Sequence, residues 1–186
     1  MPFTSGFGPC GYDFTELQSP SEYFLLFFDE DIQKLIVEET NRYADQYFEV
    51  NPQAKTSPYL RDWRPLDKEE LKIFLGIIIF MGLVKLPEMR LHWEQNLILS
   101  QSQVATVMPR DRFTLILKFL HLNNNRHDHG TDKLFKVRRF ISTLLPKFKQ
   151  FYKLESNIAI DEKMIKFSGR SHMKQYIKNK TIQWGF

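Results

Sequence analysis

Apolar residues recur at helical spacing over much of the first 150 positions. From Asp29 onward they return every three or four residues, which is the period of an amphipathic α-helix. Asp29 and Asp31 favour a helix start there, because carboxylates stabilise the positive N-terminal end of the helix dipole. The apolar face consists of Ile32, Leu35, Ile36, Tyr43 and Tyr47. The pattern predicts a helix from residue 29 to about residue 48, then a proline-containing loop over 50–65.

A second helix is predicted from a capping box. Asp67 suits the N-cap, and Glu70, three residues later, is placed to reach back to the cap backbone. The apolar face that follows is so broad that we expect this helix to be buried between others. That face consists of Leu71, Phe74, Leu75, Ile78 and Ile79. Gly82 and Pro87 are expected to end the helix.

Three more helices are predicted before residue 153, which together indicate a helical bundle with short loops. A short one lies near residues 100–107, and Pro109 occupies the first turn of the next. Asp132 starts the last helix, in which Pro146 predicts a kink or a break. The middle helix places Phe113, Ile116, Leu117 and Leu120 on one face. The last helix has a predicted buried side of Leu134, Val137, Ile141, Leu144, Leu145 and Phe148.

Near-alternation of apolar and polar residues replaces the helical period after Asn157. Residues 158–167 indicate a strand, 168–170 (Ser-Gly-Arg) a turn, and 173–178 a returning strand. We therefore expect a mostly α-helical protein in three parts. These are an arm without regular structure over 1–22, a helical region over 23–157, and the first β-hairpin of a sheet over 158–186.

Composition excludes several classes of protein. The single cysteine, Cys10, rules out an internal disulfide framework and a cysteine-based zinc site, and it favours a reducing compartment. The N-terminus has no basic region followed by an apolar core, so no secretory signal is predicted. The longest apolar run, over 73–84, is interrupted by two glycines and is too short to span a bilayer, so no membrane partner is expected.

The charge is divided unevenly along the chain. Residues 1–109 hold 9 basic and 16 acidic residues, a net −7, whereas residues 110–186 hold 17 basic and 6 acidic residues, a net +11. No acidic residue follows Glu162. A basic C-terminal portion favours nucleic acid as a partner, and a solvated basic face is the alternative.

Asp161 is the main candidate for a chemical role. It follows an apolar run and falls inside the predicted strand, where an unpaired buried carboxylate would be unfavourable. Metal ligation would offset that cost, and pairing with Lys163 or an arginine is the alternative. Glu162 should point to the opposite face of the strand, so we expect a structural role for it.

Histidines give a weaker metal signal. His127 and His129 flank Asp128, but they lie in a polar loop next to Gly130, which does not favour a metal site. His92 and His121 are expected to be structural. No Ser-His-Asp or Cys-His pattern and no phosphate-binding glycine loop is present.

Two groups of basic residues are candidate DNA contacts. On the last predicted helix, Arg138 lies closest to the apolar face and is expected to pair internally, whereas Lys136 and Arg139 lie on the outer side, where phosphates are reachable. The second group interleaves with Phe167, Tyr176 and Trp184, a pattern typical of a surface that contacts a nucleic-acid backbone. Its members are Lys166, Arg170, Lys174, Lys178 and Lys180.

The strings around these residues resemble those of the piggyBac-type transposases. That family's pattern is Asp-Glu, then Phe-x-Gly-Arg, then Lys-Gln-Tyr, then Lys-Pro-x-x-Trp-Gly. Here the matching strings are Asp161-Glu162, Phe167 to Arg170, Lys174 to Tyr176, and Lys180 to Gly185, with Thr181 in place of the proline. Helical segments 63–87, 108–125 and 132–148 match as well, so the likeness covers about residues 20–186.

The resemblance implies a helical dimerisation and DNA-binding region that leads into an RNase H-like α/β core, here represented by its first hairpin. It implies a nuclear protein whose partners are DNA, as transposon ends and a TTAA target, and a second copy of the chain. In the family's core, three aspartates hold two Mg²⁺ ions that activate water or a 3′-hydroxyl for attack on DNA phosphates. Asp161 matches the first of these aspartates.

The second and third aspartates are expected to lie beyond residue 186. One carboxylate cannot hold two metal ions in the geometry of in-line displacement, so we expect a truncated transposase that neither binds Mg²⁺ productively nor cleaves DNA alone. Two alternatives stay open. One is a domesticated DNA-binding or dimerisation module that regulates a full-length relative, and the other is an incomplete gene model without an independent function.

Overall fold

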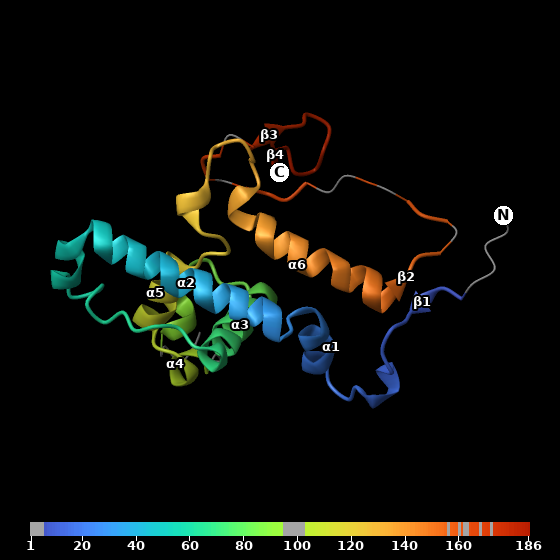
Figure 1. The fold of residues 1–186 in the computed structure, drawn as a ribbon, viewed down its shortest axis with the longest axis horizontal. Coiled ribbons are helices and arrows are strands. Elements are labelled where there is room, and N and C mark those ends of the chain that lie inside the picture. Colours follow the sequence, from blue (N-terminus) through green and yellow to red (C-terminus); the bar gives the residue numbers. More distant parts are fainter. Residues whose placement is uncertain are drawn as a thin grey trace. The chain divides into compact units, whose positions relative to one another are not determined.

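The structure, a computed structural model, describes residues 6–94, 103–155, 157–159, 161, 164–167, 169–171 and 173–186. The chain forms two compact units (Figure 1). The helical unit is Leu17–Lys147, and the strand unit combines Met1–Glu16 with Phe148–Phe186. Among the described residues, no helix is long and apolar enough to cross a membrane.

The helices follow the predicted order, and two of them begin where the sequence indicates. Asp29 caps α2 by accepting a hydrogen bond from the Ile32 amide at 3.2 Å, and Asp67 caps α3 by accepting one from the Glu70 amide at 2.8 Å. The α-helices are α1 (Pro20–Phe27), α2 (Glu30–Val50), α3 (Lys68–Leu83), α4 (Val104–Val107), α5 (Arg110–Phe119) and α6 (Phe135–Phe151). Short 3-10 turns lie at Phe14–Glu16, Pro52–Thr56, Met89–Trp93 and Asn125–His127.

Helix α1 was not predicted, and the arm without regular structure expected over 1–22 is wrong, because Gly8–Pro9 forms β1, Phe14–Glu16 forms a 3-10 turn and α1 begins at Pro20. Ser19 and Glu22 form a reciprocal capping box: the Glu22 amide donates to Ser19 Oγ at 3.4 Å, and the Ser19 amide donates to the Glu22 carboxylate at 2.9 Å. Pro20 holds the first helical position, where a missing N–H costs nothing. The local signal was therefore present in the sequence.

Two prolines affect their helices differently from what the sequence predicts. Pro109 is the N-cap of α5, so that helix begins one residue later than predicted. Helix α6 runs through Pro146 to Phe151 without a break, whereas α3 ends at Leu83, between Gly82 and Pro87, as predicted.

The main core lies where α2 packs against α3 and α5 (Figure 1). Its centre consists of large apolar side chains that are almost fully buried: Ile32, Leu71, Phe74, Phe113 and Ile116. A second cluster surrounds Phe119. The centroid of its ring lies 4.7 Å from that of Trp63 and 5.4 Å from that of Tyr47. Burial of these aromatic rings supplies much of the packing energy of the unit.

Helix α3 is less buried than its composition predicts. Leu71 and Phe74 are fully buried as expected, but Ile78 is 39% exposed and Ile79 49% exposed. Helix α6 is likewise only partly covered: Leu134, Leu145 and Phe148 are exposed, although they were expected on its buried side. The described residues cover one stripe of each helix and leave the adjoining apolar positions in contact with solvent.

The strand unit contains two short antiparallel pairs. Strand β1 (Gly8–Pro9) pairs with β2 (Tyr152–Lys153), and β3 (Gln175–Tyr176) pairs with β4 (Trp184–Gly185). Beside β1, Gly11 has a φ of +73°, and a Cβ there would lie 2.3 Å from the Gln150 carbonyl oxygen. Only glycine suits that conformation and that approach.

The predicted hairpin between 158–167 and 173–178 is wrong. In the described residues both segments pair with the end of the chain instead: Ile165 and Phe186 exchange backbone hydrogen bonds of 3.0 and 3.1 Å, and Gln175 lies opposite Gly185. The segment 184–186 therefore lies between the other two. Gly185 allows this because it has no Cβ. A Cβ at that position would lie only 2.0 Å from the Ile165 carbonyl oxygen.

Candidate nucleic-acid interface

Asp161 does not lie on a buried strand. Its backbone is outside the strands that the structure describes, and its side chain is exposed. The expectation of a buried carboxylate is therefore wrong for this residue. Glu162, expected to be structural, and Lys163, the alternative partner of Asp161, lie outside the described residues.

The described residues do not fit a magnesium site. Within that part of the chain, no three His, Cys, Asp or Glu side chains come together closely enough to hold a metal ion. This includes the His127 and His129 loop. A magnesium ion at a phosphoryl-transfer site uses carboxylates together with substrate oxygens, and Asp161 offers a single exposed carboxylate.

Arg138 on α6 is held by an acidic neighbour. Its guanidinium makes two hydrogen bonds of 2.8 Å to the carboxylate of Asp132. The side-chain hydrogen bonding from Arg138 is the main cause that lowers the pKa of Asp132 to about 2. The fork-to-fork geometry fixes the guanidinium along its own helix.

The Arg139 side chain on α6 is 51% exposed, as expected for the outer side, but its guanidinium reaches a buried acid. It donates to Glu39 Oε1 at 2.5 Å, and Arg42 pairs with the same oxygen. Glu39 is 1% exposed, so this pair neutralises a carboxylate inside the helical unit. Lys136 is exposed and forms no ion pair with another described residue. DNA contact by Lys136, Arg138 and Arg139 stays a prediction.

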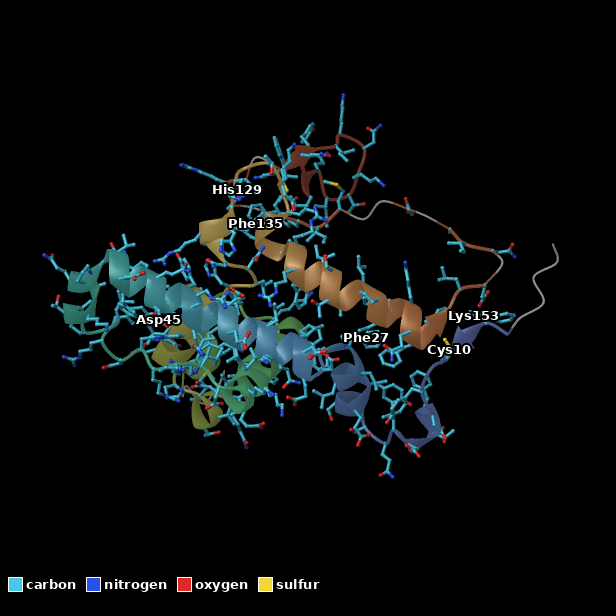
Figure 2. All side chains as sticks on the ribbon, viewed as in Figure 1. Cys10, Phe27, Asp45, His129, Phe135 and Lys153 are labelled. Carbon is cyan, nitrogen blue, oxygen red and sulfur yellow. The ribbon has the colours of Figure 1, made fainter. Side chains whose placement is uncertain are left out.

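The basic residues around β3 and β4 are differently placed. Lys166, Arg170 and Lys178 are exposed, Lys174 is half-buried, and none of the four forms an ion pair with a described residue. Lys180, the fifth predicted contact, is half-buried. Figure 2 shows side chains that end in nitrogen projecting from the ribbon around these strands. Lys166, Arg170, Lys174 and Lys178 are therefore not held by a described carboxylate, whereas Arg138 and Arg139 on α6 are.

Aromatic rings adjoin these cations. Tyr176 lies opposite Trp184 in the β3–β4 pair, and the ring centroids are 4.9 Å apart. Lys174 Nζ lies 5.2 Å from the centroid of the Trp184 ring, a cation–π distance. An open hollow of about 520 Å³ adjoins the indole. Its lining consists of Lys166, Phe167, Lys174, Thr181, Ile182, Gln183 and Trp184.

Sequence reasoning missed part of this hollow. Thr181 and Gln183 line it, but their small polar side chains carry no functional signal of their own. They are found only once the structure places them around one hollow with Lys166 and Lys174. The basic and aromatic members were found in advance, since their alternation is visible in the sequence.

Comparison with known proteins identifies the class of this chain. The family model described as Transposase IS4 matches residues 19–186, and the chain belongs to that family of transposases. Its relatives are of the piggyBac type, as the motifs around Asp161 predict. The human PiggyBac transposable element-derived protein 3 is 34% identical over 173 residues, which are 93% of this chain and 27% of that protein.

Two further comparisons agree. The human PiggyBac transposable element-derived protein 2 is 34% identical over 168 residues, 90% of this chain and 26% of its own length. A piggyBac transposase solved as a synaptic complex with hairpin DNA has a TM-score of 0.79 and 26% identity, covering 97% of this chain and 37% of that one. The chain thus spans about a quarter of the length of these human relatives.

Proposed function

We propose that this chain is a DNA-binding part of a piggyBac-type, transposable element-derived protein, and that its strand unit contacts DNA phosphates. The observation that carries this proposal is the state of its cations. Lys166, Arg170, Lys174 and Lys178 pair with no described acid, whereas on α6 Arg138, Arg139 and Lys147 are each tied to a carboxylate and Lys136 pairs with no described acid.

The charge pattern supports a polyanionic partner. From residue 163 to residue 186 there are six basic residues and no acidic one. Phosphates attract such a surface over several ångströms and release counterions on contact. The solved relative was captured with DNA, which favours the same kind of partner here. Transposon ends, a TTAA target, a homodimeric assembly and a nuclear location are parts of this proposal.

The proposal places the strand unit at the start of an RNase H-like core. Asp161 then corresponds to the first metal-binding aspartate of the family. Because the described residues gather no metal-binding group of three side chains around it, we propose that this chain binds DNA without cleaving it.

Fluorescence anisotropy with a labelled duplex tests the DNA contact. A strand-unit charge variant would carry Gln at Lys166, Arg170, Lys174 and Lys178. A matched helical-unit charge variant would carry Gln at Lys34, Lys55, Lys72 and Lys85, which are all exposed and remove the same charge. We expect the slope of log affinity against log salt to fall by about 0.9 for each phosphate that the protein no longer neutralises. That fall should occur in the strand-unit charge variant alone.

Either of two results would overturn the proposal. One is duplex binding that does not weaken as salt rises. The other is an equal fall in slope in both charge variants, since only net charge would then matter.

A further inference from the structure

The aromatic pair of the strand unit is placed to bind something other than duplex phosphates. We propose that Tyr176 and Trp184 stack on unpaired bases, so that this face binds single-stranded nucleic acid. The inference rests on the proposed function, because it uses the same cations for the phosphates, and it adds a class of substrate to it.

Strand pairing brings the aromatic side chains to one face. Residues that lie directly opposite in an antiparallel pair point to the same side, which places Tyr176 beside Trp184. On the other edge of β4, the Phe167 amide donates to the Trp184 carbonyl at 3.4 Å, so Phe167 joins the same row. Alternation along the strand directs Gly185 to the opposite side.

The two central rings are open to solvent. Trp184 is 53% exposed and Tyr176 is 50% exposed. Large aromatic side chains bury most of their surface when packing is their only role. Two of them side by side, half uncovered and only 4.9 Å apart, form a platform of π faces.

The charges around these two rings favour an anionic partner. The Lys174 ammonium lies 5.2 Å from the indole centroid, and Lys166 lines the same hollow. No acidic residue occurs after Glu162, so the surroundings disfavour a cationic partner. A chain of bases joined by phosphates supplies both a π face for the rings and an anion for the lysines.

An unpaired strand fits this arrangement better than a duplex does. Inside a duplex each base is already stacked on its neighbours and presents only its edge in a groove. A single strand exposes base faces, and stacking on aromatic side chains tolerates any sequence. Thr181 and Gln183 line the same hollow and add polar groups for hydrogen bonds to a base.

The test compares three labelled probes on the full chain: a short thymidine strand, an abasic strand of equal length, and a duplex. We expect the thymidine strand to bind at least about tenfold more tightly than the abasic strand, which is the order of base–aromatic stacking. Trp184→Leu should remove most of that difference, while Trp184→Phe, which keeps a ring, should retain most of it. Duplex affinity should change less than about twofold in either variant, because phosphate contacts dominate it.

Hydrogen exchange in the sheet is the control for correct folding of the variants. The amides of Ile165, Ile177 and Phe186 donate to backbone carbonyls across the strands, and their hydrogen-exchange protection reports whether Trp184→Leu keeps the sheet. If that protection disappears, Tyr176→Leu and the two single-stranded probes on the unaltered chain decide the question.

Equal affinity of the thymidine and abasic strands would overturn the inference, and duplex binding would then still support the proposed function. Concentration-dependent self-association that Trp184→Leu abolishes would also overturn it, because a second copy would then occupy the platform. If the unaltered chain binds none of the three probes, the proposed function itself is wrong.

Discussion

The Glu70 carboxylate forms a buried ion pair with Arg112 inside the helical unit. The sequence predicts that its carboxylate closes a capping box on α3. Instead, Arg112 donates to both of its oxygens, from Nε at 2.7 Å and from Nη2 at 2.5 Å. Arg64 adds a third bond of 2.7 Å. The Arg112 guanidinium also lies 4.9 Å from the Trp63 ring. The pair is buried, with Glu70 and Arg112 each 8% exposed.

Glu70→Gln should lower the free energy of unfolding by about 3 kcal/mol, because it leaves the Arg112 charge buried without its counterion. Urea unfolding measures this change. Glu69→Gln is the matched control, since the Glu69 side chain is 81% exposed and pairs only with Lys72. That control should change stability by less than about 0.5 kcal/mol. Equal effects of the two substitutions would contradict the assigned role of the buried pair.

His121 gives the helical unit a pH dependence of known sign. Its ring stacks on Tyr43 with centroids 3.4 Å apart, and Nε2 lies 3.0 Å from the Asn125 amide nitrogen. Burial is the main cause that lowers the pKa of His121 below its ordinary value of 6.5. The unfolded chain therefore binds the proton first as the pH falls.

It follows that the stability contributed by His121 is present above pH 6.5 and is lost as the pH falls through the lowered pKa. Thermal unfolding at a series of pH values should show this loss, and His121→Asn should make the profile flatter over that range. An NMR titration of the folded protein that places the His121 pKa at or above its ordinary value would refute the prediction.

At the scale of elements, helix starts were predictable because their signals are local. Asp29 and Asp67 each cap the helix within three residues of themselves, and the Ser19–Glu22 box that was overlooked is equally local. The partners of buried charges were not predictable. Arg139 reaches Glu39 across 100 positions, and Arg112 reaches Glu70 across 42.

Strand pairing was predicted wrongly for a related reason. A turn at Ser168 to Arg170 suggested that neighbouring segments pair, yet the choice of partner depends on how closely two backbones can approach. Gly185 is the residue that permits close approach to Ile165. The basic and aromatic residues that the sequence singled out do lie together despite this change of partner, as Lys174 beside Trp184 and Trp184 opposite Tyr176 show, while their contact with DNA stays a prediction.

Gly185→Ala should therefore disrupt the β4 pairing. The added Cβ would lie 2.0 Å from the Ile165 carbonyl oxygen, a backbone atom that no side-chain rotation relieves. Hydrogen exchange should show reduced protection at the amides of Ile165 and Phe186. Gly76→Ala is the control: nothing lies within 4 Å of its Cβ position in α3, and it should raise stability by about 0.5–1 kcal/mol. Unchanged protection in Gly185→Ala would contradict the pairing.

At the scale of the whole molecule, we propose that membership of a transposase family does not make this chain catalytic by itself. The chain belongs to a transposase family over residues 19–186, but its described residues gather no metal-binding group of three side chains around Asp161. We predict that the purified chain with Mg²⁺ leaves supercoiled plasmid DNA intact, and that Asp161→Ala alters duplex affinity less than about twofold. Magnesium-dependent nicking that disappears in Asp161→Ala would show that the chain is catalytic by itself.

The central claim is that the unpaired cations of the strand unit bind DNA. The salt dependence of duplex binding in the strand-unit charge variant, measured beside the helical-unit charge variant, tests it most directly. The account predicts a slope that falls by about 0.9 for each phosphate that the strand unit no longer neutralises, and an unchanged slope in the matched variant. Identical slopes in both variants and the unaltered chain would contradict it.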